Sequence, residues 1–379
     1  MKTVLMHSEP SWRVASSTVE AFVTRRGGQL APVTFDRTGT GIQPYAIAPW
    51  VGEKLPKDMP PILQVLRGDF FCLPFGGNAR VFRGEHHPLH GETANERWHF
   101  ESLKAGRLHL SLQTKVRAGR VDKFISLRDG HDAVYCQHVI SGMSGPMSPG
   151  HHATLKFPDA PNSGLVATSL FVFGQVFPGE VERPAERGYS ALKPGAMFDS
   201  LSSVPMADGG VADLSRYPAR RGFEDVVMLV SDAAAPFAWT AVTFPKQRYV
   251  WFALKDPRVL RHTVFWMSNG GRHYPPWNGR HINVMGLEEV TSYFHPGLAE
   301  SAHKNALSSL GHPTTLMLDS RHPTVVNYIM AVAKIPTRFD RVAAIEPADA
   351  GVKLRSENGT TLNVALAPDF LQMPALGMS

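Results

Sequence analysis

Residues 66–100, LRGDFFCLPFGGNARVFRGEHHPLHGETANERWHF, contain the pattern that decides how the rest of the chain is interpreted. An apolar, strand-like run at residues 70–75 is followed by Gly76 and Gly77, which permit backbone conformations that a β-carbon would forbid. Arg80, several histidines and Trp98 come next. Arginine offers fixed planar donors, imidazole moves protons near neutral pH, and the indole supplies an aromatic face. The stretch therefore predicts a tight loop that brings polar groups to one edge of a sheet, and it favours a polar, ring-shaped substrate.

The composition favours many short strands over long helices. Of the 379 residues, 43% are hydrophobic and 19% charged. The 33 glycines and 30 prolines make up more of the chain than the ~12% of average usage. Residues 108–114 and 121–127 alternate between apolar and polar types, as half-buried strands do. We therefore expect a mainly all-β protein that forms one domain over residues 1–379, with short helices at 299–310 and 323–334.

Charge and cysteine usage narrow the function classes. The net charge is +6, but the basic residues are scattered, whereas a nucleic-acid binder concentrates them in a patch or stripe. The N-terminus has no continuous apolar segment, and no apolar run approaches ~18 residues. Cys72 and Cys136 lie in apolar runs and read as reduced core thiols. We expect a cytoplasmic protein that binds neither nucleic acid nor membrane; a homodimer stays open.

Three side chains are candidates for acid–base chemistry. His90 and His152 follow flexible, glycine-containing segments, and Glu288 lies in an apolar strand-like run. A carboxylate is costly to bury there unless it is paired or functional, and proton transfer needs one group that takes a proton and another that delivers one. Taken singly, each histidine could be an ordinary surface or hydrogen-bonded residue. Glu288 or Glu289 could also face outward, because adjacent strand positions point to opposite faces.

Four short motifs, taken in order, resemble the aldose 1-epimerases of the galactose mutarotase-like superfamily. They are N-A-R at 78–80, L-H-G at 89–91 with a following tryptophan, H-H-A-T-L-K-F at 151–157 and G-L-E-E at 286–289. The resemblance spans about residues 10–300. It implies a β-supersandwich of large, mostly antiparallel sheets, a cleft for a small-molecule sugar, and neither a metal nor an organic cofactor.

Catalytic roles follow from the resemblance at three positions. Glu288 looks like the general base and His152 like the general acid. His90 is similar to the histidine that helps to position the ring oxygen and shares its proton. His151 and Glu289 are the register alternatives.

The resemblance also implies residues that hold the substrate. Arg80 looks like the arginine that hydrogen-bonds sugar hydroxyls, and Asp225 is similar to a substrate-holding aspartate. Trp98, His151 and Trp277 are further candidates for sugar contact. The family's residues after the second histidine are replaced here by Thr154 and Lys156, which leaves the sugar specificity open.

Three other functions remain open at this point. The same scaffold could serve a non-catalytic sugar-binding protein. A metal enzyme could use His86, His87 and His90 with Glu92 or Glu96, because imidazole and carboxylate suit Fe, Mn or Zn. A sugar-phosphate epimerase would need extra cations in the cleft, for which the chain offers Arg83, Arg97, Arg272 and Arg280. Residues 158–222 could form a lid, a dimer contact or a surface addition.

Overall fold

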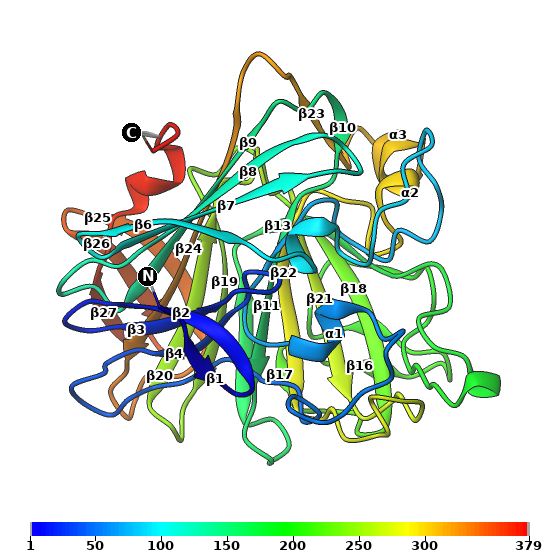
Figure 1. Cartoon of the computed structure of the whole chain (residues 1–379). Helices are drawn as coiled ribbons and strands as arrows, with labels where there is room; N and C mark the ends of the chain where they lie inside the picture. Colours follow the sequence, from blue (N-terminus) through cyan, green and yellow to red (C-terminus); the bar gives the residue numbers. More distant parts are fainter. Residues whose placement is uncertain (1, 377–379) are drawn as a thin grey trace.

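Two large antiparallel sheets dominate the computed structural model, which describes residues 2–376 (Figure 1). The seven-stranded sheet has the order β14-β13-β18-β21-β22-β11-β5. Its strands are β5 (Phe71–Cys72), β11 (Gly150–Lys156), β13 (Phe171–Val176), β14 (Met197–Phe198), β18 (Phe223–Ser231), β21 (His262–Asn269) and β22 (Val284–Val290).

The nine-stranded sheet has the order β17-β12-β19-β20-β24-β9-β8-β7-β6. Its strands are β6 (His99–Lys104), β7 (Arg107–Thr114), β8 (Gly119–Ser126), β9 (Ala133–Ser141), β12 (Gly164–Thr168), β17 (Arg216–Tyr217), β19 (Ala238–Phe244), β20 (Tyr249–Lys255) and β24 (Thr324–Lys334).

Smaller elements flank these sheets. A four-stranded sheet at the N-terminus contains β1 (Val4–Met6), β2 (Glu9–Ala15), β3 (Glu20–Thr24) and β4 (Leu30–Thr34), and a three-stranded sheet near the C-terminus contains β25 (Val342–Ala348), β26 (Gly351–Ser356) and β27 (Thr361–Ala365). β10 (Gly145–Met147) pairs with β23 (Leu316–Leu318), and β15 (Val204–Pro205) pairs with β16 (Val211–Ala212). The helical elements are α1 (Pro61–Val65), α2 (Leu298–Ala302), α3 (Ala306–Ser309), η1 (Glu92–Ala94), η2 (Pro184–Glu186) and η3 (Pro368–Gln372).

Both large sheets are covered on both faces, since each contributes alternate residues to two apolar cores. On β18, Val227 and Leu229 belong to the core between the two large sheets, whereas Val226 and Met228 belong to a core on the opposite face. That outer core also contains Ile62 of α1, which lies beside the seven-stranded sheet in Figure 1. The outer face of the nine-stranded sheet packs against the C-terminal three-stranded sheet. The side chains on the outer face of the seven-stranded sheet therefore meet loops and α1, not a second sheet.

The all-β prediction is confirmed, and so is the expectation of large antiparallel sheets with a few short helices. The helix expected at 323–334 is wrong: the segment is β24, paired along its length with β20 and β9. A short apolar run buried on both faces has the same hydrophobicity as a buried helix, and periodicity cannot separate the two. The helix expected at 299–310 is divided into α2 and α3, where the Asn305 side chain caps the second segment.

Residues 158–222 are more regular than their turn-rich sequence suggests. They provide β12 and β17 at one edge of the nine-stranded sheet, and β13 and β14 at one edge of the seven-stranded sheet. Cys72 and Cys136 are buried and free, as expected. No helix among residues 2–376 is long and apolar enough to cross a membrane.

Candidate active site

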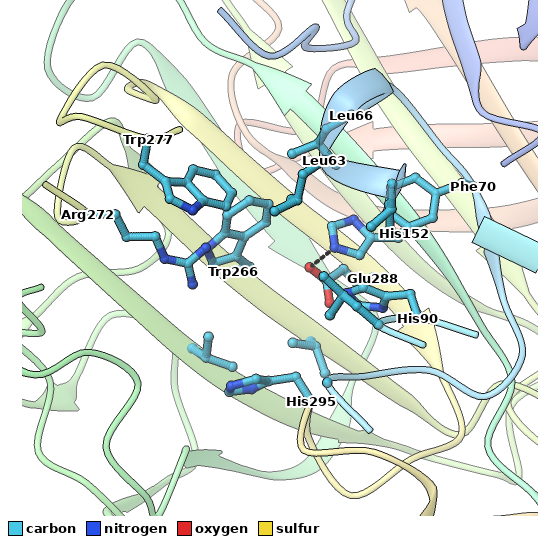
Figure 2. A pocket seen from close by; sticks show the side chains of 15 residues that line it. Leu63, Leu66, Phe70, His90, His152, Trp266, Arg272, Trp277, Glu288 and His295 are labelled. Atoms are coloured by element: carbon cyan, nitrogen blue, oxygen red, sulfur yellow. Dashed lines mark ion pairs between the residues drawn. The ribbon is translucent and has the colours of Figure 1, made fainter. Parts of the chain in front are cut away.

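A cavity of about 150 Å³ lies against the outer face of the seven-stranded sheet. Its floor is made by side chains of β11, β18, β21 and β22, and its walls by α1 and by the segments that carry Leu89, Trp277 and His295 (Figure 2). His90, His152 and Glu288 all line it. The fold therefore brings together three residues that are widely separated in the sequence.

Strand pairing places His152 beside Glu288. β11 and β22 are antiparallel neighbours in which these two residues lie directly opposite each other. Their side chains point into the cavity, and His152 Nε2 lies 3.1 Å from Glu288 Oε1 (Figure 2). Both side chains are at most 5% exposed. A buried imidazole and a buried carboxyl group thus lie in direct contact at the wall of the cavity.

His90 reaches the cavity through the glycine turn of residues 66–100. Its own φ is 58°, and Gly91 has a φ of 77°. A β-carbon on Gly91 would lie 2.0 Å from the carbonyl oxygen of Leu73, so only glycine fits this close approach. The backbone amide of His90 donates to the carbonyl of Gly76 at 2.7 Å. This turn sets the His90 ring edge-on to that of His152, with 5.0 Å between ring centroids.

Burial shifts the proton affinities of the three groups in opposite directions. It raises the pKa of Glu288 well above 4.5 and lowers the pKa of His152 to about 4. It also lowers the pKa of His90 well below its usual value. In each case the low-dielectric surroundings penalise the charged form. Burial therefore favours a Glu288 carboxyl group that keeps its proton and a His152 imidazole that is neutral, and the two groups lie 3.1 Å apart.

Of the four arginines that the sequence offered for a sugar phosphate, Arg272 lines the cavity and the other three do not. Its guanidinium carbon lies 4.5 Å from the ring centroid of Trp277 and 5.4 Å from that of Trp266. Its Nε donates to Glu182 at 2.5 Å. Among residues 2–376, its terminal amino groups form no hydrogen bond. They are therefore available to a ligand, above two indole rings.

Glu224 lies close to both Trp266 and Arg272 and helps to hold them in place. It accepts a hydrogen bond from Trp266 Nε1 at 2.9 Å, and its Oε2 lies 4.0 Å from Arg272 Nε. Burial raises the pKa of Glu224 to about 7, although Arg272 opposes the rise. Glu224 and Glu182 thus hold Arg272 and Trp266 in place.

Trp277 joins the three catalytic candidates at the cavity, but Arg80 and Asp225 do not. The Arg80 side chain is 67% exposed and lies 3.5 Å from Glu300. Asp225 points to the opposite side of β18 from Val226, and its Oδ1 accepts hydrogen bonds from the backbone amides of Ala191 and Leu192. Its role is to anchor the segment between β13 and β14, because the pleat turns it away from the cavity.

Trp98 and His151 also lie elsewhere. Trp98 is buried, donates to the carbonyl of Thr93 at 2.9 Å and packs under the Lys123 ammonium group. His151 points into the space between the two large sheets, where its Nδ1 lies 2.9 Å from Asp69 Oδ2. The alternation of side chains along β11 separates His151 from His152, and the same alternation along β22 separates Glu289 from Glu288.

The proposed metal ligands are dispersed. His87 lies 2.8 Å from Glu85, and Glu92 accepts hydrogen bonds from the backbone amides of Lys115 and Val116. His86 and Glu96 are exposed. Within residues 2–376, no three histidine, cysteine or acidic side chains come close enough to hold a metal ion. The cations suggested for a sugar phosphate are dispersed too, since Arg83, Arg97 and Arg280 do not line the cavity.

Sequence reasoning missed Trp266 and His295 as cavity residues. For Trp266 a signal existed: on β21, Val264 lies opposite Glu288 and Trp266 opposite Gly286, so all four residues share one face of the sheet. That signal becomes readable only when the register of β21 and β22 is known. His295 lies in the loop between β22 and α2, and nothing in its sequence context marks it.

No protein-family model and no curated protein sequence matches the chain. Solved structures do match. A candidate aldose 1-epimerase from Escherichia coli is 14% identical with a TM-score of 0.57, covering 86% of this chain and 99% of its own. A galactose mutarotase related enzyme from Lactobacillus acidophilus is 10% identical with a TM-score of 0.56, covering 86% and 99%. A candidate aldose 1-epimerase from Klebsiella pneumoniae is 11% identical with a TM-score of 0.58, covering 87% and 80%.

At these identities the likeness concerns the fold, and it agrees with the two large antiparallel sheets. The resemblance found in the sequence motifs is therefore confirmed at the level of architecture. The chain has the fold of the galactose mutarotase-like proteins.

Proposed function

We propose that the protein is an aldose 1-epimerase, an isomerase that interconverts the α and β anomers of a sugar. The observation that carries this proposal is the contact between His152 and Glu288, 3.1 Å apart and both facing one cavity. Anomer interconversion needs a base at the anomeric hydroxyl and an acid at the ring oxygen, and these two atoms are bonded to the same carbon. A neighbouring carboxyl group and imidazole match that spacing.

Burial favours the neutral forms of the pair, so the reaction starts once the proton has moved from Glu288 to His152, which leaves Glu288 ionised and His152 protonated. Glu288 takes the proton of the anomeric hydroxyl O1 while His152 gives its proton to the ring oxygen O5. The C1–O5 bond breaks, and the C1–O1 bond becomes the carbonyl of the open aldose. Rotation about C1–C2 presents the other face of this carbonyl, and the reverse proton transfers close the ring as the second anomer.

The proton count of the pair fits this sequence. Ring opening leaves Glu288 protonated and His152 neutral, which are the forms that burial favours. Ring closure restores the charged forms, so the pair holds one proton throughout. His90, edge-on to His152 at 5.0 Å, helps to position the ring oxygen. No cofactor takes part in these steps.

Arg272 takes the substrate-holding role that the sequence motif suggested for Arg80. Its terminal amino groups face the cavity, and its planar donors match pairs of neighbouring hydroxyl oxygens. Trp266 and Trp277 offer aromatic surfaces against which the C–H groups of a sugar ring can pack.

The test is anomeric exchange, measured by saturation-transfer NMR on a panel of aldoses. The protein should accelerate the exchange of at least one aldose well beyond the rate in buffer. Replacing Arg272 with glutamine (Arg272→Gln) should raise KM with a smaller effect on kcat, while Arg80→Gln, at the exposed position, should change neither. Binding of a sugar without accelerated exchange would contradict catalysis and identify a non-catalytic sugar-binding protein.

A further inference from the structure

Apolar and aromatic groups surround the acid that would serve the ring oxygen. The His152 ring stacks on Phe70 with 4.5 Å between centroids and an interplanar angle of 20°, and Trp266 meets it edge-on at 5.7 Å. The His90 ring contacts Phe75 edge-on at 5.0 Å. Phe70 and Phe75 are fully buried. Of these two rings, Phe70 lines the cavity and Phe75 does not, so a substrate group placed beside His152 meets the Phe70 ring.

The side chains of α1 extend this apolar wall. Leu63 and Leu66 line the cavity, and Figure 2 shows them on the same side as Phe70 and His152. Arg272 lies on the other side of the cavity, beyond Trp266 (Figure 2). One end of the cavity is thus apolar apart from the acid–base groups, and the other end carries the free donors.

The covalent structure of a pyranose decides which of its groups reaches each end. In the mechanism proposed above, O1 meets Glu288 and O5 meets His152. The C5 atom is bonded to O5, so its substituent lies next to His152 and the Phe70 wall. The hydroxyls on C2, C3 and C4 extend away from O5, towards Arg272 and His295.

A common hexose would place a CH₂OH group against this wall. The titratable side chains that line the cavity are those of His90, His152, Arg272, Glu288 and His295. Two indole N–H groups line it as well, but that of Trp266 donates to Glu224, and Trp277 lies on the Arg272 side (Figure 2). His90, His152 and Glu288 are committed to O5 and O1, and Arg272 lies at the far end. A buried hydroxyl without a partner is costly, whereas a buried methyl group is favourable.

We infer that the substrate is a 6-deoxyaldose, a sugar that carries a methyl group on C5 where a common hexose carries CH₂OH. This inference rests on the proposed function, because the orientation of the ring follows from the roles of Glu288 and His152. A uronic acid would place a carboxylate against the Phe70 wall and is disfavoured most. A pentose avoids the buried hydroxyl but leaves the wall without a partner.

Two matched series of sugars test the inference, because within each series only the C5 substituent differs. They are D-galactose, 6-deoxy-D-galactose and L-arabinose, and D-glucose, 6-deoxy-D-glucose and D-xylose. In the series that the protein accepts, kcat/KM for anomeric exchange should be at least about 10-fold higher for the 6-deoxy sugar than for the parent hexose, with the pentose between them. Equal or better exchange of the parent hexose would overturn the inference while leaving the proposed function intact.

If no sugar shows accelerated exchange, a binding measurement separates failure of the catalytic proposal from failure of the inference about the C5 substituent. Titration followed by tryptophan fluorescence would then rank the same sugars. A preference for the 6-deoxy sugar would refute the catalytic proposal but would still support apolar surroundings for the C5 substituent. No binding of any sugar would overturn both.

A substitution in the wall gives a second test. Leu63 is half-buried on α1, so Leu63→Gln can supply a hydrogen-bonding partner near C5 without opening the core. The ratio of kcat/KM between the 6-deoxy sugar and its parent hexose should fall about 10-fold. Leu170→Gln, at a position that is 85% exposed, should leave the ratio unchanged. An unchanged ratio in Leu63→Gln would contradict the placement of C5 against this wall.

Discussion

The two faces of β11 and β22 carry the same pair of residue types and use them differently. On the outer face, His152 lies opposite Glu288; one residue earlier on β11, His151 lies opposite Glu289 on the inner face. The outer pair has its mutual 3.1 Å contact and a cavity beside it. In the inner pair, His151 contacts Asp69, while Glu289 forms a buried ion pair with Lys255 and accepts hydrogen bonds from Thr240 and Thr263.

The two pairs contain the same residue types, so the groups that contact them, and not their identities, distinguish the proposed reactive pair from the structural one. Glu289 is paired with a cation and accepts hydrogen bonds on both oxygens, so its partners hold it in the core. Among residues 2–376, Glu288 forms no ion pair with a lysine or arginine, and burial raises its pKa. A register slip of one residue would exchange the two faces, so the pairing of β11 with β22 determines which glutamate can do chemistry.

Replacing Glu288 with glutamine should have the largest effect. Glu288→Gln keeps the shape of the side chain but removes the base, and a well-placed proton transfer contributes ~10²- to 10⁴-fold. Anomeric exchange measured by NMR should fall by about that factor while the thermal unfolding profile keeps its cooperativity. The matched variant Glu289→Gln, assayed where it is folded, should exchange anomers at close to the wild-type rate. Equal losses in the two variants would contradict the division between the faces.

Glu289→Gln should instead reduce stability. It leaves the Lys255 ammonium group, which is 1% exposed, buried without its counter-charge, and breaking a buried ion pair in this way costs about 3–5 kcal/mol. Chemical denaturation measures the loss. The double variant Glu289→Gln with Lys255→Met should recover most of it. A loss below about 1 kcal/mol would show that the inner pair does not hold the sheets together.

The pH dependence of stability should distinguish Glu288 from glutamine at the same position. Because the folded-state pKa of Glu288 is raised above its usual 4.5, the folded protein keeps a proton that the unfolded chain releases. The contribution of Glu288 to stability is therefore lost as the pH rises from 4.5 towards the folded pKa, by up to about 1.4 kcal/mol per pH unit. The free energy of unfolding of Glu288→Gln relative to wild type should rise as the pH increases from 4.5 towards the folded-state pKa. Parallel curves for the two proteins would show that the Glu288 carboxyl is not perturbed.

His152 acts in the opposite sense, since its pKa is lowered to about 4 from its usual 6.5. The stability that it contributes is present above 6.5 and is lost as the pH falls towards 4. The comparison with Glu288→Gln above pH 6.5 is therefore the cleanest window for the carboxyl group.

Thr154 should give the smallest effect. It lies two residues after His152 on the same face of β11, and its Oγ1 is 3.2 Å from His152 Nδ1. Thr154→Val removes this hydrogen bond with little change in shape, so the imidazole loses a positioning contact. We expect kcat to fall about 10-fold, as for the loss of ~1.4 kcal/mol of transition-state stabilisation, with KM unchanged and the acidic limb of the pH–rate profile displaced. A rise in KM alone would contradict a positioning role.

The sequence predicted the β architecture, and it singled out His90, His152 and Glu288 as candidates, which the structure brings to one cavity. Alternating strands and turn residues indicated the β class. The backbone next to His90 requires a glycine, because Gly91 has a positive φ and leaves no room for a β-carbon. What the sequence could not supply was the pairing of distant strands. Whether Asp225 or Glu224 faces the cavity depends on the parity of β18, and the structure assigns that face to Glu224.

The arginine and the aromatic residues that line the cavity could not be identified from the sequence either, because they depend on the pairing of distant strands. Arg80 stands close to His90 in sequence but on an exposed loop, whereas Arg272 is brought to the cavity by the loop after β21. Trp98 follows the histidines in sequence but is buried in the core, and Trp266 and Trp277 line the cavity instead. Proximity along the chain predicted those contacts wrongly because the sheet order decides them.

A crystal structure with a bound aldose that the protein interconverts is the most direct test of the acid–base assignment. The assignment predicts that O1 lies within hydrogen-bonding distance of the Glu288 carboxyl group, with the ring oxygen facing Nε2 of His152 and the C2–C4 hydroxyls towards Arg272. An anomeric centre that faces Arg272, or a sugar bound away from this cavity, would contradict it.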